Sequence, residues 1–222
     1  MPAKLLTEFG GTFVFLSVIA LSGPTGPLAP LVIGLALAAM VYMGGHVSGA
    51  HYNPAVSFGL LLRGVITPAI FGLYCVTQLL AGSLAFAVAF LISGANGGIH
   101  PGPGVYWYSA LTAEVLFTTA LALVVMNVAA TRETAGNSYY GLAIGFTVAC
   151  GAFVARPISG GAFNPAVAFG ATLREALFGH GTWSDLWIYL VGPLIGATLA
   201  AAIHRIQARP GPVPPELAER QV

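Results

Sequence analysis

One stretch occurs twice in this sequence, and the repeat constrains the fold more than any other feature. Residues 48–63 read SGAHYNPAVSFGLLLR, and residues 159–174 read SGGAFNPAVAFGATLR. From the asparagine onward the two copies agree at eight of eleven positions. One isolated Asn-Pro-Ala triplet is a trivial turn, but two near-duplicates of this length indicate a chain built from two related halves.

The composition indicates that most of the surface faces lipid. Only 7% of the 222 residues are charged and 57% are hydrophobic, whereas a soluble domain carries about 25% charged residues. The net charge of +1 argues against a nucleic-acid partner. Stretches apolar and long enough to approach a bilayer span lie at 7–22, 28–45, 68–92, 109–129, 139–156 and 185–206. The first is short, and a signal peptide remains an alternative for it, although Glu8 interrupts the apolar run.

The basic residues predict the orientation of these spans. Six spans place six of the eight Lys and Arg residues on one side, with Arg156 and Arg174 on the other. The richer side is expected to be cytoplasmic, which puts both termini inside. Residues 207–222 are polar and rich in proline, and we expect them to form a disordered cytoplasmic tail.

Two glutamates recur at matching places in the two halves. Glu8 and Glu114 lie 45 and 50 residues before the asparagines of the two repeats. An ionisable residue inside a span is costly and usually marks function, although Glu8 lies near a span end and an interfacial position is the alternative. Each half reads as span, span, repeated segment, span. Because three is an odd number, the second half crosses in the opposite sense, which predicts an inverted repeat with halves at about 4–92 and 109–206.

Each repeated segment predicts a short helix that enters the membrane only halfway. About ten helical residues rise about 15 Å, half of a hydrocarbon core roughly 30 Å thick. Asparagine is a good N-cap and proline suits the first turn, so each helix is expected to begin at its Asn-Pro-Ala triplet. Arg63 and Arg174 are expected at the helix C-termini, within reach of water.

With these motifs the chain resembles the aquaporin family, also called the major intrinsic proteins. The resemblance covers residues 4–206 and rests on GHVSGAHYNPAVSFG (45–59), SGGAFNPAVAFG (159–170), LWIYLVGPLIGA (186–197) and the two glutamates. It implies an all-α membrane protein with six transmembrane helices and two re-entrant half-helices, forming a single channel domain over 1–206. It also implies a homotetramer in the plasma (inner) membrane, with no enzymatic activity, no metal and no cofactor.

The resemblance also implies how the repeated segments act. The pore motifs would be Asn53, Pro54, Ala55, Asn164, Pro165 and Ala166. Both helix N-termini would point at the pore centre, where the asparagine amides donate to a passing oxygen and the dipoles repel cations. Glu8 and Glu114 would accept hydrogen bonds from the loops before the triplets. His51 is expected to hydrogen-bond within its loop, with pH sensing as the alternative.

One position departs from the family pattern. Most members carry an arginine directly after the second triplet, whereas this chain has Val167, which matches Val56 of the first copy. The filter positions that the resemblance implies are Ile33, Ala152, Gly161 and Val167. These residues predict a wide apolar filter that passes water and larger neutral solutes such as ammonia, urea or small polyols. Ala168 replaces the aspartate of glycerol facilitators, which weighs against a dedicated glycerol pore.

Other functions stay open. One alternative is a channel mainly for ammonia, urea or glycerol-type solutes, and another is a non-conducting structural protein of the same fold. A secondary transporter is the rival from another class, since inverted repeats also build transporters. His100 is expected to be a solvated loop residue, and Arg156 either a solvated arginine or a charge in the outer vestibule. Cys75 and Cys150 lie in apolar segments and are expected to be free thiols.

Overall fold

The computed structural model describes residues 1–94, 97–179 and 181–208. Its helices, in chain order, are α1 (Pro2–Leu21), η1 (Gly23–Leu28), α2 (Ala29–Ser48), α3 (Pro54–Leu62), α4 (Pro68–Ser93), α5 (Trp107–Ala129), η2 (Arg132–Thr134), α6 (Tyr140–Ser159), α7 (Pro165–Phe178) and α8 (Leu186–Gln207). Within the described residues, six spans are long and apolar enough to cross a membrane. The predicted all-α fold is therefore confirmed. Most of the expected tail, residues 209–222, lies outside the described residues.

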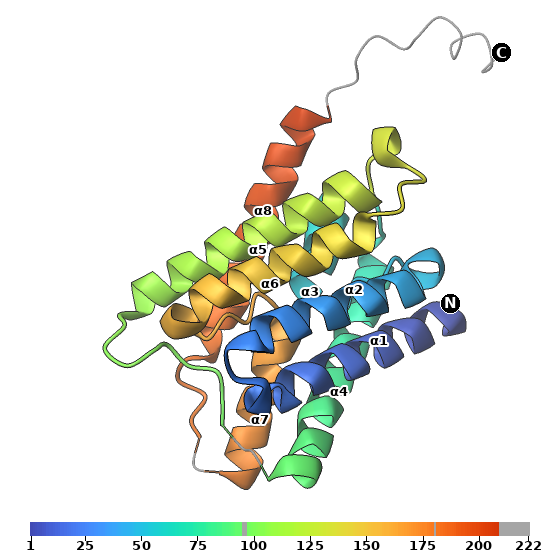
Figure 1. The fold of residues 1–222 in the computed structure, drawn as a ribbon. Coiled ribbons are helices and arrows are strands. Elements are labelled where there is room, and N and C mark those ends of the chain that lie inside the picture. Colours follow the sequence, from blue (N-terminus) through green and yellow to red (C-terminus); the bar gives the residue numbers. More distant parts are fainter. Residues whose placement is uncertain (95–96, 180, 209–222) are drawn as a thin grey trace, which may run out of the picture.

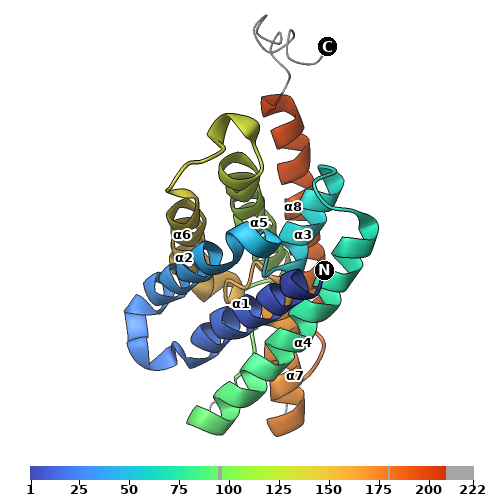
Figure 2. The ribbon, with the colours of Figure 1, turned by 90° about the vertical axis from the view of Figure 1, so that its right-hand side faces the viewer.

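The long helices pack in the same scheme in both parts of the chain. α1 packs against α2 and α4, and α5 packs in the same way against α6 and α8. Contacts between α2 and α6 join these two groups. α3 packs against α8, and α7 packs against α4, so each short helix also contacts the other group. In Figures 1 and 2, α3 lies toward the upper end of the bundle and α7 toward the lower end.

Glycines allow the long helices to approach closely. A Cβ atom on Gly34 of α2 would clash with the carbonyl oxygen of Gly145 on α6, and the reverse holds as well. On α8, a Cβ atom on Gly192 would lie 2.8 Å from the Cβ of Glu114, and one on Gly196 would lie 2.7 Å from the carbonyl oxygen of Val115. Small residues four apart are typical of tight helix packing in membranes. Gly145 ends the segment GLAIG (141–145), and Gly192 and Gly196 begin and end GPLIG (192–196), so both segments serve close helix packing.

The two short helices begin alike but end differently. α3 has nine residues and ends at Leu62, with Arg63 as its C-cap, and Gly64 follows with φ +73°. The amide of Gly64 donates to the carbonyl of Leu61, and a left-handed glycine of this kind is a common helix stop. α7 has 14 residues and ends only before Gly179. The expectation that Arg174 ends its helix in water is therefore wrong: the helix continues past it, and Arg174 is only 6% exposed.

The outside of the bundle is apolar. Large hydrophobic side chains on α4 point away from the core, with Leu80 61% exposed and Leu91 78% exposed. Leu116 on α5 and Ile206 on α8 are 59% and 65% exposed. Contiguous apolar surface of this kind is unfavourable in water but suits contact with lipid chains. The surface thus agrees with an integral membrane protein.

Candidate functional site

The two asparagines cap the two short helices in the same way. The Oδ1 atom of Asn53 accepts a hydrogen bond from the amide of Ala55 at 2.8 Å. The Oδ1 atom of Asn164 accepts from the amide of Ala166 at 2.9 Å. Both asparagines have extended backbone, and each proline that follows begins its helix. These are the geometries that favour asparagine at the N-cap and proline at the first helical position.

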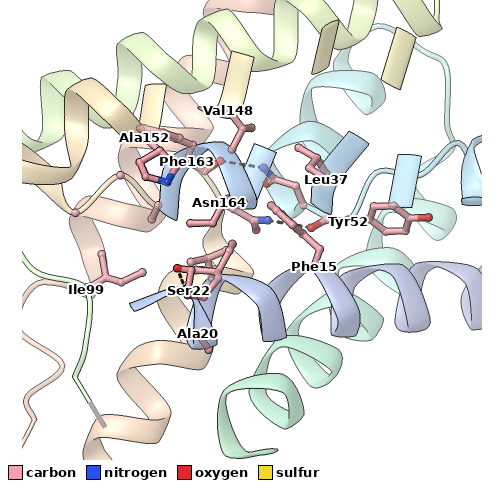
Figure 3. Close-up of a pocket in the computed structure, with 18 of the residues that line it drawn as sticks. Phe15, Ala20, Ser22, Leu37, Tyr52, Ile99, Val148, Ala152, Phe163 and Asn164 are labelled. Carbon is pink, nitrogen blue, oxygen red and sulfur yellow. Dashed lines mark hydrogen bonds between the residues drawn. The ribbon is translucent and has the colours of Figure 1, made fainter. Parts of the chain in front are cut away.

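The same side chains connect the two repeats to each other. The Nδ2 atom of Asn53 donates to the carbonyl of Phe163, and Nδ2 of Asn164 donates to the carbonyl of Tyr52, both at 2.9 Å. Figure 3 shows the second of these bonds as a dashed line between Asn164 and Tyr52. A side-chain amide carries two hydrogens. Each asparagine therefore donates one amide hydrogen to the opposite loop, and its second amide hydrogen remains available for another acceptor.

The loops before the asparagines adopt a backbone conformation that is unfavourable for their residues. Tyr52 and Phe163, the residues directly before the asparagines, both have φ of +49°, and Ala50 has φ of +51°. Left-handed backbone at residues other than glycine costs about 1–3 kcal/mol each and persists only where surrounding contacts impose it. Buried glutamates supply those contacts in both loops.

Glu8 on α1 holds the first loop. Its carboxylate, which is completely buried, accepts hydrogen bonds from the amides of His51 and Tyr52, both at 2.9 Å. It also accepts from Oγ of Ser48 at 2.7 Å and from Nε2 of Gln78 at 2.9 Å. A carboxylate taken out of water is stable only when its oxygens are satisfied by donors in this way.

Glu114 on α5 holds the second loop in the matching arrangement. Its buried carboxylate accepts from the amides of Ala162 at 3.0 Å and Phe163 at 2.7 Å, and from Oγ of Ser159 at 2.7 Å. The two serines that contact the glutamates were not singled out from the sequence. The signal was nevertheless present, because Ser48 and Ser159 stand first in the two copies of the repeat.

His51 is fixed by elements outside its own loop. Its buried ring nitrogen Nδ1 lies 3.0 Å from Oγ of Ser57 on α3, and its ring meets the ring of Tyr74 edge-on at 5.0 Å. The expected hydrogen bond within the loop is therefore replaced by one to the half-helix. Tyr74 in turn donates to the carbonyl of Ser48, as Tyr189 donates to the carbonyl of Ser159 in the other half.

A cavity of about 470 Å³ runs past both asparagines. It extends from residues 50–53 to residues 97–100, and both asparagines line its wall. The four predicted filter residues line it as well: Ile33, Ala152, Gly161 and Val167. Apolar side chains complete much of the wall, and Figure 3 labels Phe15, Leu37, Ile99, Val148 and Phe163 among them. Sequence reasoning missed Phe15, Leu37, Ile99 and Val148, because nothing distinguishes them from an ordinary hydrophobic core.

One end of the cavity is bordered by residues 97–100, Arg156 and Arg174, and we call this end the distal mouth. His100 bridges two carboxylates there, with Nε2 2.8 Å from Glu175 and Nδ1 2.9 Å from Asp185. Burial lowers the pKa of His100, but the bonds to Asp185 and Glu175 outweigh it and the pKa is raised. His100 is a loop residue, as expected, and its side chain is 37% exposed, but the expectation missed its pairing with the two carboxylates. Arg156 is exposed at this mouth.

Metal-binding geometry is not found in the described ranges, which contain no group of three or more His, Cys, Asp or Glu side chains that could hold an ion. Cys75 and Cys150 are free thiols. The features that remain are a cavity, two short helices capped by asparagine and the carboxylates that hold their loops. This arrangement can hold small molecules, and it offers them hydrogen-bond donors on the cavity wall.

Comparison with known proteins gives the same picture. A family model described as "Major intrinsic protein" matches residues 3–204. The probable aquaporin TIP3-2 of Oryza sativa subsp. japonica is 36% identical, covering 98% of this chain and 86% of the rice protein. Aquaporin AqpM of Methanothermobacter marburgensis is also 36% identical, covering 92% of this chain and 97% of its own.

A solved structure agrees in fold. The aquaglyceroporin from Plasmodium falciparum superposes with a TM-score of 0.80 at 23% identity, covering 91% of this chain and 94% of the other. At that identity the likeness concerns the fold alone. Since the family model covers nearly the whole chain and several relatives exceed 30% identity over most of it, the chain belongs to the major intrinsic protein family and is an integral membrane protein of the aquaporin type.

Proposed function

We propose that this chain forms a passive pore that conducts water and also small neutral solutes. The observation that carries the proposal is the cavity of about 470 Å³ that passes both capping asparagines. Each asparagine keeps one amide hydrogen after its bond to the opposite loop. The passage thus offers donors at its middle and apolar walls on either side, which suits rapid movement of molecules that bind only weakly.

The two asparagines also supply a reason why protons do not follow the water. A water oxygen that accepts from both amides points its own hydrogens away from the centre, toward the two ends of the passage. It cannot then accept a hydrogen bond from its neighbours, so a chain of waters is interrupted. The N-termini of α3 and α7 meet here, and each carries roughly half a positive charge, which raises the free energy of any cation at this point.

The residues at the four filter positions support the wider solute range. Ile33, Ala152, Gly161 and Val167 place no polar or charged side chain on that part of the wall. Without a charged donor, a filter selects mainly by size, and alanine and glycine leave more room than aromatic residues do. We therefore propose that ammonia, urea and small polyols pass together with water, and that Glu8, Glu114 and His51 support the loops.

We also propose the assembly and the setting of this pore. The chain acts as a single domain over 1–206 whose halves, about 4–92 and 109–206, form an inverted repeat. It assembles as a homotetramer with one pore per protomer in the plasma (inner) membrane. The excess of Lys and Arg on one side of the spans supports cytoplasmic termini.

The test is transport by the purified protein in liposomes. Stopped-flow light scattering follows shrinking against sucrose, glycerol and urea gradients, with empty liposomes as the baseline. Ala152→Trp is expected to lower every flux at least tenfold because it fills the filter. Phe153→Trp is the matched control, since Phe153 is the next residue but is 50% exposed on the outside of the bundle.

Two results would contradict the proposal at different levels. Water flux no greater than in empty liposomes would exclude a water-conducting pore. Rapid water flux without any urea or glycerol flux would leave the channel intact but would contradict the wide filter. Equal losses in the tryptophan variants of Ala152 and Phe153 would show that Ala152 does not border the conducting path.

A further inference from the structure

Arg174 lies within α7 and is buried, whereas the repeated sequence predicted a helix C-terminus within reach of water. It follows Val167 by seven residues on α7, close to two helical turns, so both side chains lie on one face of the helix about 10 Å apart along its axis. Both line the same cavity. Val167 stands at the filter, and Arg174 stands at the distal mouth.

The guanidinium of Arg174 is buried and incompletely bonded. The side chain is 6% exposed, and its Cζ atom lies 4.9 Å from the ring centre of Phe86 on α4. Nη2 donates to the carbonyl of Gly97. Nε and Nη1 are buried, and neither makes a hydrogen bond to any described part of the chain.

No carboxylate in the described ranges forms an ion pair with this cation. Glu175 is the next residue, but its carboxylate lies 2.8 Å from Nε2 of His100. The other arginine that borders the cavity, Arg156, is exposed, so water and salt screen its charge. A guanidinium keeps its proton at any physiological pH. The charge of neighbouring Glu175 acts on this guanidinium, but no described carboxylate pairs with it directly, so part of its field extends into the cavity beside it.

We propose that Arg174 is the fixed cation of the distal mouth and a specificity-determining residue of the pore. It disfavours cations there and favours neutral or anionic molecules that present an oxygen to its free N–H groups. The proposal rests on the proposed function, because specificity has meaning only for a conducting pore. Arg174 would thus supply a positive charge at the mouth, whereas the filter has the uncharged Val167. The alternative is that Arg174 only holds Gly97 in place.

The experiment measures the electrostatic potential at the mouth directly. Ile99 lines the cavity two residues from Gly97, and Ile99→Cys in a background with Cys75→Ala and Cys150→Ala supplies one thiol. The full-length protein in non-ionic detergent at low salt is treated with two methanethiosulfonates. One carries a sulfonate and the other a trimethylammonium group. Mass spectrometry gives the two modification rates, each normalised to 2-mercaptoethanol.

The ratio of the modification rate with the anionic reagent to that with the cationic reagent reports the electrostatic potential at the thiol. With Arg174 present, the normalised ratio is expected to favour the anionic reagent, and Arg174→Met is expected to lower it about tenfold, since one buried charge acts with opposite sign on the two reagents. A change in loop position alters access for both reagents alike and leaves their ratio the same. The ratio therefore separates an electrostatic role from a structural one.

Three further variants make the test decisive. Arg174→Gln keeps a donor for Gly97 without the charge, and it is expected to lower the anionic-to-cationic rate ratio as much as Arg174→Met does. It therefore also serves as the test if Arg174→Met does not fold. Arg174→Lys keeps the charge and is expected to retain the ratio within about twofold. Arg156→Met, the exposed matched control, is expected to change it much less than Arg174→Met.

An unchanged ratio in both Arg174→Met and Arg174→Gln overturns the proposal, as does an Arg156→Met effect of the same size. The measurement does not require conduction. A protein that fails the liposome test but shows the shifted ratio therefore contradicts the proposed function alone. A conducting protein with an unchanged ratio contradicts this inference alone.

Discussion

α3 and α7 derive from nearly identical sequences, but they have different lengths and different surroundings. Both begin at an asparagine cap with the same hydrogen bond and the same proline. α3 stops after nine residues, and α7 continues for 14. As a result Arg63 caps its helix, whereas Arg174 is buried against Phe86 beside the cavity.

The comparison teaches that the two ends of a helix depend on different information. The cap at the start needs only Asn-Pro and a few local backbone bonds, and both copies contain it. The stop depends on the residue that follows the repeat, which is Gly64 in one copy and Glu175 in the other. The repeated segments thus share the geometry of their N-termini, and the two short helices differ toward their C-termini.

The largest effects are expected where the halves are most alike, at the loop glutamates. Glu114→Ala removes the acceptor for the amides of Ala162 and Phe163. It should lower the free energy of unfolding by roughly 2–6 kcal/mol, because each buried unsatisfied donor costs roughly 1–3 kcal/mol. Glu8→Ala should cost at least as much, since Gln78 also loses one of its two acceptors. Unfolding of the detergent-solubilised protein by SDS titration measures both.

The control for the glutamates is Glu133→Ala on η2, where the side chain is exposed. This variant should unfold like the unmodified protein. If Glu114→Ala behaves as Glu133→Ala does, the carboxylate is not what holds the second loop.

A matched glycine pair sharpens the comparison of the two half-helices. A Cβ atom on Gly170 of α7 would lie 2.8 Å from the backbone carbonyl oxygen of Gly82, which cannot move aside. A Cβ atom on Gly59, the equivalent position of α3, would lie 2.8 Å from the flexible end of Met126. Gly170→Ala should therefore cost roughly 1–3 kcal/mol, and Gly59→Ala less than about 1 kcal/mol. Equal costs in the same SDS titration would contradict this reading of the α4–α7 contact.

The next prediction concerns the valines that follow the two triplets. Val167→Arg places a charged donor in the filter and should reduce urea and glycerol flux about tenfold relative to water flux. Val56→Arg, the same exchange in the first copy, should lower water and urea flux together, because Val56 lines the cavity but is not one of the four proposed filter positions. Stopped-flow measurements on proteoliposomes give both ratios. Unchanged urea and glycerol flux in Val167→Arg would show that Val167 does not border the narrowest part of the pore.

The smallest effect is expected from pH at the distal mouth. There His100 contacts two carboxylates, and no other histidine in the described residues makes such a contact. His100 can donate to both Glu175 and Asp185 only when it is protonated. Because the folded-state pKa of His100 is raised, its contribution is fully present below its unfolded pKa of about 6.5 and is lost as pH rises through the folded value.

Hydrogen exchange of residues 97–102 measures this pH dependence. After correction for intrinsic exchange rates, protection should be greater at pH 5 than at pH 9, by a few-fold. His100→Gln should remove the difference, and Glu133→Gln should preserve it. A difference that persists without the histidine would assign the pH dependence to another group.

The sequence by itself determined the features that depend on local backbone chemistry. Six apolar stretches indicated six spans, and the Asn-Pro pairs indicated where the half-helices begin. The repeat also aligned Glu8 with Glu114, although it did not indicate that Ser48 and Ser159 contact these glutamates. These predictions succeed because hydropathy, helix capping and spacing act within a few residues of the chain.

Tertiary structure alone decided which distant residues meet. Arg174 contacts Gly97, which lies 77 residues away, and His100 contacts Asp185 across 85 residues. Neither contact follows from spacing, because each depends on how far α7 extends and how closely it packs against α4. Gly82 and Gly170 set that approach through the absence of side chains. A missing Cβ atom leaves little signal in a sequence that holds 29 glycines, but its consequence in three dimensions is a buried arginine at the mouth of the cavity.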